Sequence, residues 1–346
     1  MKKIKIKKNN SISKLKIINK SLSVQKYKKK QKKTKKSNVF KYLKYQHFHK
    51  FQIFFIIILL FIFFIIPGQI NDNKIKIALC TMGKLENLYV EEYVNHYIKL
   101  GVDKIFIYDD NDINTEKFSD VLKKGKYRKY VTIYENIKDR IKNQMDAYTE
   151  CYTINKDFYD WFIMVDMDEF LVIVNNTLKD YLSSSIFNVC DFIRIHWKIA
   201  TDNDLIYYDN RTLFERFTKK LIKSTFTKSV IKGHIPNLTY GVHHIRKSPI
   251  RNISCTNTGH ILKKKEYNRD GVGRINTEKA YIIHFYYKST EEFIKKYKRG
   301  YGDWVADKEL NLKRKVRDYF KDNKRTKEKI EYVEKELKIN VKSIWR

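Results

Sequence analysis

Short apolar runs alternate with amphipathic segments through the middle of the chain. Four runs have the length of buried strands: residues 75–80, 104–108, 130–134 and 161–165. The segments between them have the apolar spacing of helices: residues 87–100, 116–123 and 140–154. Gly101 and Gly125 stand where the first two helices are expected to stop. This order predicts a doubly wound α/β sheet with right-handed crossovers.

An acidic triplet interrupts the fourth strand-like run. The apolar residues 161–165 lead into Asp166, Asp168 and Glu169, and an apolar run resumes at 170–174. Two carboxylates at i and i+2 can project from one edge of a sheet, where they repel each other and are costly to desolvate. A divalent cation shared with substrate phosphates, Mg²⁺ or Mn²⁺, is the usual compensation. The alternative is a strand end followed by a solvated acidic turn.

Polar residues follow three of the predicted strands. Thr81, the acidic cluster 109–112 and the pair Asp166 and Asp168 all fall at carboxyl ends, where open α/β sheets bind ligands. No G-x-G-x-x-G follows the first strand, and no phosphate-binding loop of the P-loop type occurs. A nucleotide diphosphate bound here therefore needs a metal ion to neutralise it.

The positive charge is concentrated at the N-terminus. The 346 residues carry a net charge of +33, and residues 1–50 hold 19 Lys with no Arg, Asp or Glu. More than half of the excess charge thus lies in a tail, which we expect to be disordered and able to contact anionic lipid. No helix-turn-helix, RRM or zinc module accompanies it, so a specific nucleic-acid-binding protein is disfavoured.

An apolar segment follows this tail. Residues 51–66 contain Gln52 as their only polar residue, and Pro67-Gly68 ends the run. A helix of this length spans roughly 24 Å, which suits a thin endomembrane. Lysines precede the segment, so the positive-inside rule predicts a signal anchor of a single-pass type II membrane protein, with residues 71–346 in the lumen of the ER or Golgi. The alternative is a buried core helix.

A lumenal location changes how the cysteines and asparagines are interpreted. Four cysteines occur after the apolar segment, none in a C-x-x-C pair, so one or two disulfides are expected, with three possible pairings if both form. Potential N-glycosylation sites, as in a glycoprotein, occur at Asn175, Asn210, Asn237 and Asn252.

Several blocks together resemble glycosyltransferase family 92 and the related family 2-like group, formerly known as DUF23. The resemblance covers roughly residues 75–305 and depends on the order and spacing of its blocks. These blocks are residues 78–81, 91–109 (with the sequence EEYVNHYIKLGVDKIFIYD), 165–170 (VDMDEF), 228–231, 242–244, 284–289 (HFYYKS), 291–293 and 298–300.

The resemblance implies a GT-A-like mixed sheet and a hexosyltransferase that moves a sugar from a nucleotide-sugar donor, such as a UDP-sugar, to a glycan or glycoprotein acceptor. It implies a Mn²⁺ or Mg²⁺ ion held by Asp166 and Asp168 in a DxD motif. In GT-A enzymes a downstream histidine often completes the coordination, and His284 is the first choice, ahead of His243 and His244.

Further roles follow from the same resemblance. Asp109 and Asp110 would meet the base or ribose, with Thr81 beside the nucleotide; the alternative for the two aspartates is an Asx-rich turn. An inverting transferase also needs a carboxylate base at the acceptor hydroxyl, for which Glu169 and Asp303 are the candidates.

The predicted organisation has four parts: a cytosolic tail over residues 1–50, an anchor over 51–66, a glycosyltransferase domain over 71–310 and a charged extension over 311–346. Sparse apolar positions between residues 312 and 338 predict one or two amphipathic helices.

Two other functions remain open. A membrane-tethered carbohydrate-binding protein would use the same sheet without turnover, whereas a phosphoesterase would require more His and Asp ligands.

Overall fold

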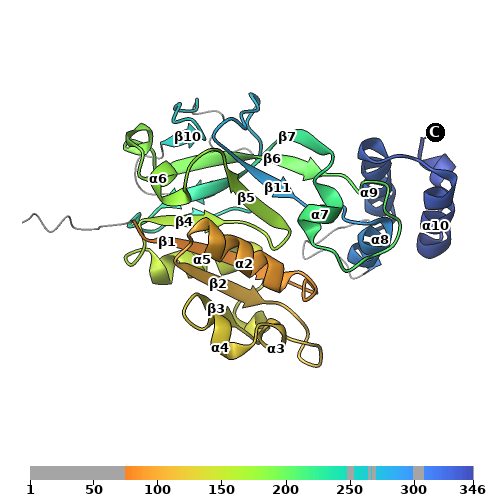
Figure 1. Cartoon of the computed structure of the whole chain (residues 1–346), viewed down its shortest axis with the longest axis horizontal. Coiled ribbons are helices and arrows are strands. Elements are labelled where there is room, and N and C mark those ends of the chain that lie inside the picture. Colours follow the sequence, from red (N-terminus) through yellow and green to blue (C-terminus); the bar gives the residue numbers. More distant parts are fainter. Residues whose placement is uncertain (1–74, 248–252, 264–265, 267–269, 299–307, 346) are drawn as a thin grey trace, which may run out of the picture. The chain divides into compact units, whose positions relative to one another are not determined.

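The computed structural model describes residues 75–247, 253–263, 266, 270–298 and 308–345 (Figure 1). The chain divides into two compact units, residues 1–73 and 74–346, and the described residues belong to the second. The predicted tail, the predicted membrane anchor and Asp303 lie outside the described residues. Among the helices that are described, none has both the length and the apolar character needed to cross a bilayer.

Four parallel strands form the first half of a mixed sheet. They are β1 (Ile77–Gly83), β2 (Lys104–Asp109), β3 (Val131–Tyr134) and β4 (Trp161–Met164), in the spatial order β3-β2-β1-β4. Helices α2 (Val90–Leu100) and α5 (Gln144–Asn155) are two of the connections between them. The strand and helix order predicted from residues 75–165 is therefore confirmed.

These helices cover opposite faces of the sheet. Ile77 and Leu79 of β1 pack in one apolar cluster with Tyr93 and Tyr97 of α2. The alternate residues of β1, among them Cys80, pack in a second cluster with α5. Since successive side chains of a strand point to opposite faces, the continuous apolar run of β1 is explained by burial on both sides.

The second half of the sheet continues with antiparallel pairs. Its order is β4-β7-β6-β11-β5, where β5 is Glu169–Ile173, β6 is Phe192–Ala200, β7 is Leu221–Lys232 and β11 is Ala280–His284. β6 and β11 are parallel, and the short β10 (Ser254–Thr256) pairs with the other end of β6. The described strands thus form one mixed sheet, with an additional two-stranded sheet of β8 (Thr239–Tyr240) and β9 (Ile245–Lys247).

Some helix boundaries differ from the predicted ones. Gly101 does end α2, in the left-handed conformation with φ 104°. Gly125, however, lies inside the short helix α4 (Lys124–Tyr127), and only Phe118–Val121 forms α3, so the predicted stop at Gly125 is wrong. Helix α5 begins later than predicted because the Asn143 side chain accepts hydrogen bonds from two backbone amides of its first turn.

The remaining elements are short or lie near the C-terminus. They are η1 (Ile137–Asp139), α6 (Leu178–Leu182), η2 (Ser185–Phe187), α7 (Leu213–Phe217), α8 (Thr290–Lys298), α9 (Lys308–Asp322), α10 (Lys327–Leu337) and η4 (Val341–Trp345). One or two helices are predicted between residues 312 and 338, and the structure has two there, α9 and α10. Their apolar residues, with Val316 and Val333 at the centre, pack against α8 in a separate core cluster. A buried ion pair of 2.8 Å joins Lys329 of α10 to Asp202, which follows β6.

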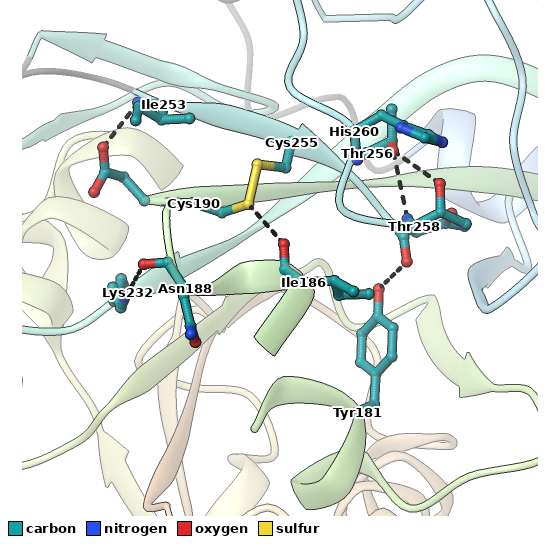
Figure 2. The surroundings of a disulfide bond; sticks show 12 residues. Tyr181, Ile186, Asn188, Cys190, Lys232, Ile253, Cys255, Thr256, Thr258 and His260 are labelled. Carbon is teal, nitrogen blue, oxygen red and sulfur yellow. Dashed lines mark hydrogen bonds between the residues drawn. A yellow bond between two sulfur atoms is a disulfide. The ribbon is translucent and has the colours of Figure 1, made fainter. Parts of the chain in front are cut away.

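Both possible disulfides form. Cys80–Cys151 joins β1 to α5. Cys190–Cys255 joins the segment just before β6 to β10. Figure 2 shows the second bond together with Tyr181 of α6, whose hydroxyl donates a 2.8 Å hydrogen bond to the Asn257 carbonyl. This disulfide and the hydrogen bonds around it hold the segment that carries β10 against the sheet.

We expect the double substitution Cys190→Ala and Cys255→Ala to lower the free energy of unfolding by about 4 kcal/mol, because the disulfide closes a loop with a sequence separation of 65. Urea unfolding without reductant measures this change. Wild-type protein in reductant is the comparison and should lose more, because both disulfides are then broken. An unchanged unfolding midpoint in the double variant would contradict the expectation.

Candidate active site

The acidic triplet forms the turn between β4 and β5. β4 ends at Met164, and β5 starts at Glu169, so Asp166 and Asp168 lie at the carboxyl end of β4. The end of β1 lies against this turn: a Cβ atom placed on Gly83 would come within 2.3 Å of the Met167 sulfur. The absence of a side chain at Gly83 therefore allows the ends of the two parallel strands to approach closely.

Asp166 is surrounded by hydrogen-bond donors from two other elements. Its Oδ1 accepts hydrogen bonds from the Gln144 amide and from the Tyr148 hydroxyl (2.9 Å), both on α5. Lys228 of β7 contributes its Nζ at 2.7 Å. Burial is the largest influence on this carboxyl and opposes its ionisation, but the charge and hydrogen bond of Lys228, together with His284, outweigh it and lower the pKa of Asp166 below its usual value.

Asp168 is buried between a histidine and a lysine. Its Oδ1 lies 3.4 Å from His284 Nε2 at the end of β11, and its Oδ2 lies 2.6 Å from Lys296 Nζ on α8. Although burial opposes ionisation, Lys296 and His284 together hold the pKa of Asp168 well below its usual range. Asp168 is therefore an anionic group that faces a histidine nitrogen.

Glu169, the third carboxylate of the acidic triplet, lies between Lys228 and His284. Its side chain is fully buried, with Oε2 at 3.6 Å from Lys228 Nζ and Oε1 at 3.9 Å from His284 Nδ1. Burial and the nearby Asp166 raise the pKa of Glu169 well above its usual value. A side chain without exposed surface does not face an acceptor hydroxyl, so this geometry favours a positioning role at His284 over the predicted role as base.

The residues around Asp168 fit a divalent cation held by few protein ligands. Asp168 Oδ1 and His284 Nε2 are separated by 3.4 Å, a distance that suits two ligands of one ion better than a hydrogen bond. Within the described residues His284 Nδ1 and Glu169 Oε1 have no hydrogen-bond partner and face each other, as in carboxylate–histidine–metal arrangements. In the same part of the chain, no group of three His, Cys, Asp or Glu residues is placed to hold an ion alone.

The other predicted site residues are in different surroundings. Both carboxylate oxygens of Asp109 accept 2.8 Å hydrogen bonds from backbone amides, those of Asn111 and Phe118, which matches the Asx-turn alternative. Asp110 is half-buried beside it, at the edge where β1 and β2 end. The Thr81 side chain is fully buried within β1. His243 and His244 lie beyond β8, and the His243 ring packs against Trp197 rather than against Asp168.

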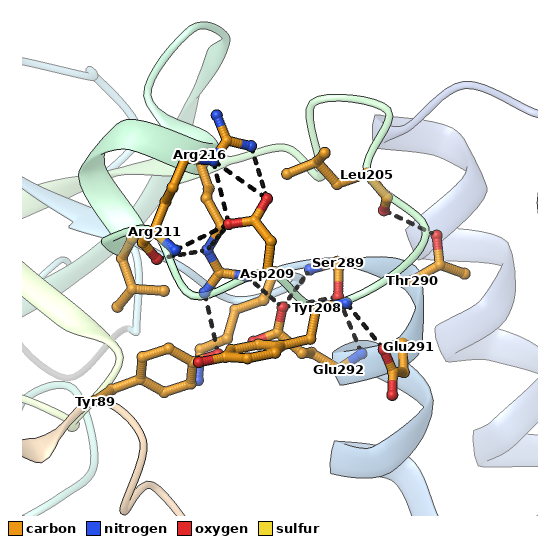
Figure 3. Close-up of polar contacts among 12 residues, drawn as sticks. Tyr89, Leu205, Tyr208, Asp209, Arg211, Arg216, Ser289, Thr290, Glu291 and Glu292 are labelled. Atoms are coloured by element: carbon orange, nitrogen blue, oxygen red, sulfur yellow. Dashed lines mark hydrogen bonds and ion pairs between the residues drawn. The ribbon is translucent and has the colours of Figure 1, made fainter.

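A buried polar network fixes the N-terminal end of α8, the helix that carries Lys296. The Arg216 guanidinium is fully buried, with Nη1 2.8 Å from a Glu292 carboxylate oxygen and Nη2 3.1 Å from the Tyr89 hydroxyl (Figure 3). Glu292 also accepts hydrogen bonds from the backbone amide and hydroxyl of Ser289. A second buried pair, Lys288 with a Glu86 oxygen at 2.6 Å, joins the same segment to the residues after β1.

Four residues that contact the carboxylates were not predicted as site residues. Gln144 and Tyr148 are spaced i, i+4 on α5, so this spacing on the helix before the acidic strand was an available signal. Lys228 and Lys296 lie 62 and 128 residues from the aspartates that they contact. Lys228 begins the family-like block 228–231, which was an available signal, whereas no local pattern distinguishes Lys296 from surface lysines in a chain so rich in lysine.

The fold and the site together define a class: a mixed α/β protein with a carboxylate–histidine site at the carboxyl edge of its central strands. The family profile of glycosyltransferase family 92 matches residues 73–338. The chain belongs to glycosyltransferase family 92, and its resemblance to that family is thereby confirmed.

Plant relatives agree with this assignment. A glycosyltransferase family 92 protein of Ricinus communis is 23% identical over 250 residues, which are 70% of this chain and 41% of that protein. Another, of Oryza sativa subsp. japonica, is 23% identical over 236 residues, which are 67% of this chain and 36% of that protein. The chain thus spans about two-fifths of the length of the curated relatives it matches.

Replacing Lys228 by Met should lower the free energy of unfolding by roughly 3–5 kcal/mol, because it leaves the Asp166 and Glu169 carboxylates without their buried cation. Lys223→Met is the matched control, since Lys223 is exposed on the same strand and should change stability by less than about 0.5 kcal/mol. Denaturant unfolding of both variants measures the difference. Equal stabilities would show that Lys228 does not compensate these carboxylates.

Proposed function

We propose that the chain transfers a sugar from a nucleotide-sugar donor to a glycan or glycoprotein acceptor, with Mn²⁺ or Mg²⁺ as cofactor. The observation that carries this proposal is the pairing of Asp168 with His284 at the carboxyl edge of β4, beside Asp166. Membership in glycosyltransferase family 92 supports the reaction class, and the mixed sheet supports the GT-A fold proposed for it.

Each residue of the site has a distinct role in this proposal. Asp168 and His284 hold the ion, and Asp166 contributes directly or through water. When bound, the ion neutralises the diphosphate that leaves as the sugar–phosphate bond breaks. Glu169 orients the His284 ring, while Lys228 keeps Asp166 ionised at a fixed position. Asp110 is the remaining candidate for a contact with the nucleoside, and Asp303 for the base at the acceptor hydroxyl.

We place this reaction in the lumen of the secretory pathway, with residues 51–66 as a type II anchor. Two disulfides are typical of proteins that fold in an oxidising compartment. The side chains of Asn175, Asn210 and Asn237, each in a potential N-glycosylation site, are exposed and therefore accessible to a glycan. Asn252 lies outside the described residues.

A carbohydrate-binding protein without turnover is the second candidate. The observation in its favour is that lysines already contact both Asp166 and Asp168, as they would in a site that never binds metal. Metal-dependent donor binding separates the two functions, because a binding protein of this kind does not require a nucleotide sugar.

We expect Asp168→Asn to reduce metal-dependent turnover by about 10²-fold or more, because the neutral amide no longer balances a divalent cation. The measurement is nucleotide release by the full-length chain in detergent, with a panel of UDP- and GDP-sugars and Mn²⁺. Asp157→Asn is the control, since the Asp157 side chain is 63% exposed and pairs with Lys156 and His234 rather than with the site residues.

Chelation of the metal should abolish wild-type turnover, and added Mn²⁺ should restore it. If wild-type protein neither binds nor turns over any nucleotide sugar under these conditions, the transferase proposal fails. If turnover persists in Asp168→Asn, the transferase proposal stands but the metal site lies elsewhere.

A further inference from the structure

An exposed phenylalanine stands next to the acidic site. Phe226 lies on β7, two residues before Lys228 and next to the point where the pairing of β7 with β6 shifts register. Its side chain is 44% exposed, whereas residues 227–231 of the same strand are buried. Phe226 is thus the point at which the buried part of β7, which supports Asp166, reaches solvent.

The Phe226 ring belongs to a continuous set of rings that leads back to Asp168. It stacks on Trp197 of β6, with centroids 5.4 Å apart and planes inclined by 23°. The Trp197 ring in turn meets His284 edge to face at 4.4 Å, and His284 lies 3.4 Å from Asp168. His243 packs against both Trp197 and Phe226, at 5.1 and 5.8 Å. We refer to Phe226, Trp197 and His243 as the aromatic shelf.

The segment next to the shelf carries polar side chains. Phe226 pairs with Gly271 through an isolated bridge, and the Thr227 amide donates a 3.0 Å hydrogen bond to the Asp270 carbonyl. The Asp270 carboxylate, 54% exposed, lies 3.2 Å from His244 Nδ1. The segment that pairs with β7 at Phe226 and Thr227 therefore also carries an exposed carboxylate paired with a histidine.

Pyranose rings fit such a surface. One face of a sugar carries several C–H groups, which pack favourably on the electron-rich face of an aromatic ring, while its hydroxyl groups need planar polar partners. A single exposed aromatic residue is common on protein surfaces and carries no such meaning. Phe226 differs because it continues a ring set that ends at the proposed metal ligands.

We propose that the aromatic shelf is the acceptor subsite, on which a sugar ring of the acceptor glycan stacks against Phe226, with Asp270 and His244 placed for its hydroxyl groups. This inference rests on the proposed transferase function. The shelf lies on the β7 and β6 side of Asp168, whereas the carboxyl ends of β1 and β2, proposed for the nucleoside, lie on the other side of β4. Donor and acceptor would thus approach the same carboxylates from opposite sides.

The test compares Phe226→Ala, Phe226→Trp and the control Phe158→Ala in the full-length chain. Phe158 is a suitable control because it is 68% exposed and lies in the turn after α5, far along the chain from the shelf. Two rates are measured for each variant, with the nucleotide sugar that the wild-type chain turns over. They are nucleotide release without acceptor, and transfer to a panel of p-nitrophenyl glycosides and released N-linked glycans.

We expect Phe226→Ala to raise the acceptor KM by about tenfold and to leave donor hydrolysis within about twofold of wild type. Phe226→Trp should retain an acceptor KM close to that of wild type, and Phe158→Ala should change neither rate. An unchanged acceptor KM in Phe226→Ala would overturn the proposal. So would a parallel loss of both rates in Phe226→Ala and Phe226→Trp, because it would show a structural role.

Failure of the underlying function gives a different result. If the wild-type chain turns over no donor, the same proteins are tested on an array of N-linked and O-linked glycans. Binding by wild type and Phe158→Ala that is lost in Phe226→Ala supports the shelf as a sugar site without transfer. Equal binding by all variants, or binding by none, overturns it.

Discussion

The structure around the acidic turn depends on the compensation of buried carboxylates by lysine. Asp168 and Glu169 are buried in the turn after β4, with Asp166 beside them. The pKa of Glu169 is raised there, and Asp166 and Asp168 would not both remain ionised in such surroundings without cations. Lys228 supplies one charge from β7 and Lys296 another from α8. β7 lies directly beside β4 in the sheet, so the order of the strands brings the first cation to the site.

This requirement connects the two halves of the domain. The parallel half, from β1 to β4, provides the aspartates, and the antiparallel half provides Lys228 and His284. α8 has to be held in place for Lys296 to reach Asp168, and the buried pairs Arg216–Glu292 and Lys288–Glu86 provide this. A buried ion pair adds little net stability, yet breaking one is costly, so these pairs specify where α8 lies more than they strengthen the fold.

Much of the first half could be predicted from the sequence, because its signals are local. Apolar runs, helical spacing and Gly101 gave β1, α2 and β2 within a few residues, and the position of the acidic triplet after a strand gave the edge at which it lies. His284 was placed near Asp168 from family resemblance, and the structure brings the two together.

What the sequence did not reveal depends on distant contacts or on competing local geometry. Lys228 becomes a buried counter-ion only through the pairing of β4 with β7, which no periodicity encodes. Asp109 is predicted to contact the base or ribose of the nucleotide, but both its carboxylate oxygens accept hydrogen bonds from backbone amides. Gly125 was taken for a helix stop, although residues 118–127 form two short helices of one turn each.

The two lysine contacts at the acidic turn differ in a way that bears on function. The Lys228 side chain is 1% exposed and also bonds the Val242 carbonyl, so its removal from Asp166 would leave a charge buried. The Lys296 side chain is 16% exposed and lies in the last turn of α8, so it is less deeply buried than Lys228. The contact at Asp166 therefore maintains the site, whereas the contact at Asp168 can be exchanged for a ligand without burying an uncompensated lysine. In the proposed transferase, Asp168 would exchange Lys296 for the ion, and Lys296 would then be available to the phosphate oxygens of the donor; in a site that binds no metal, both lysine contacts would stay in place.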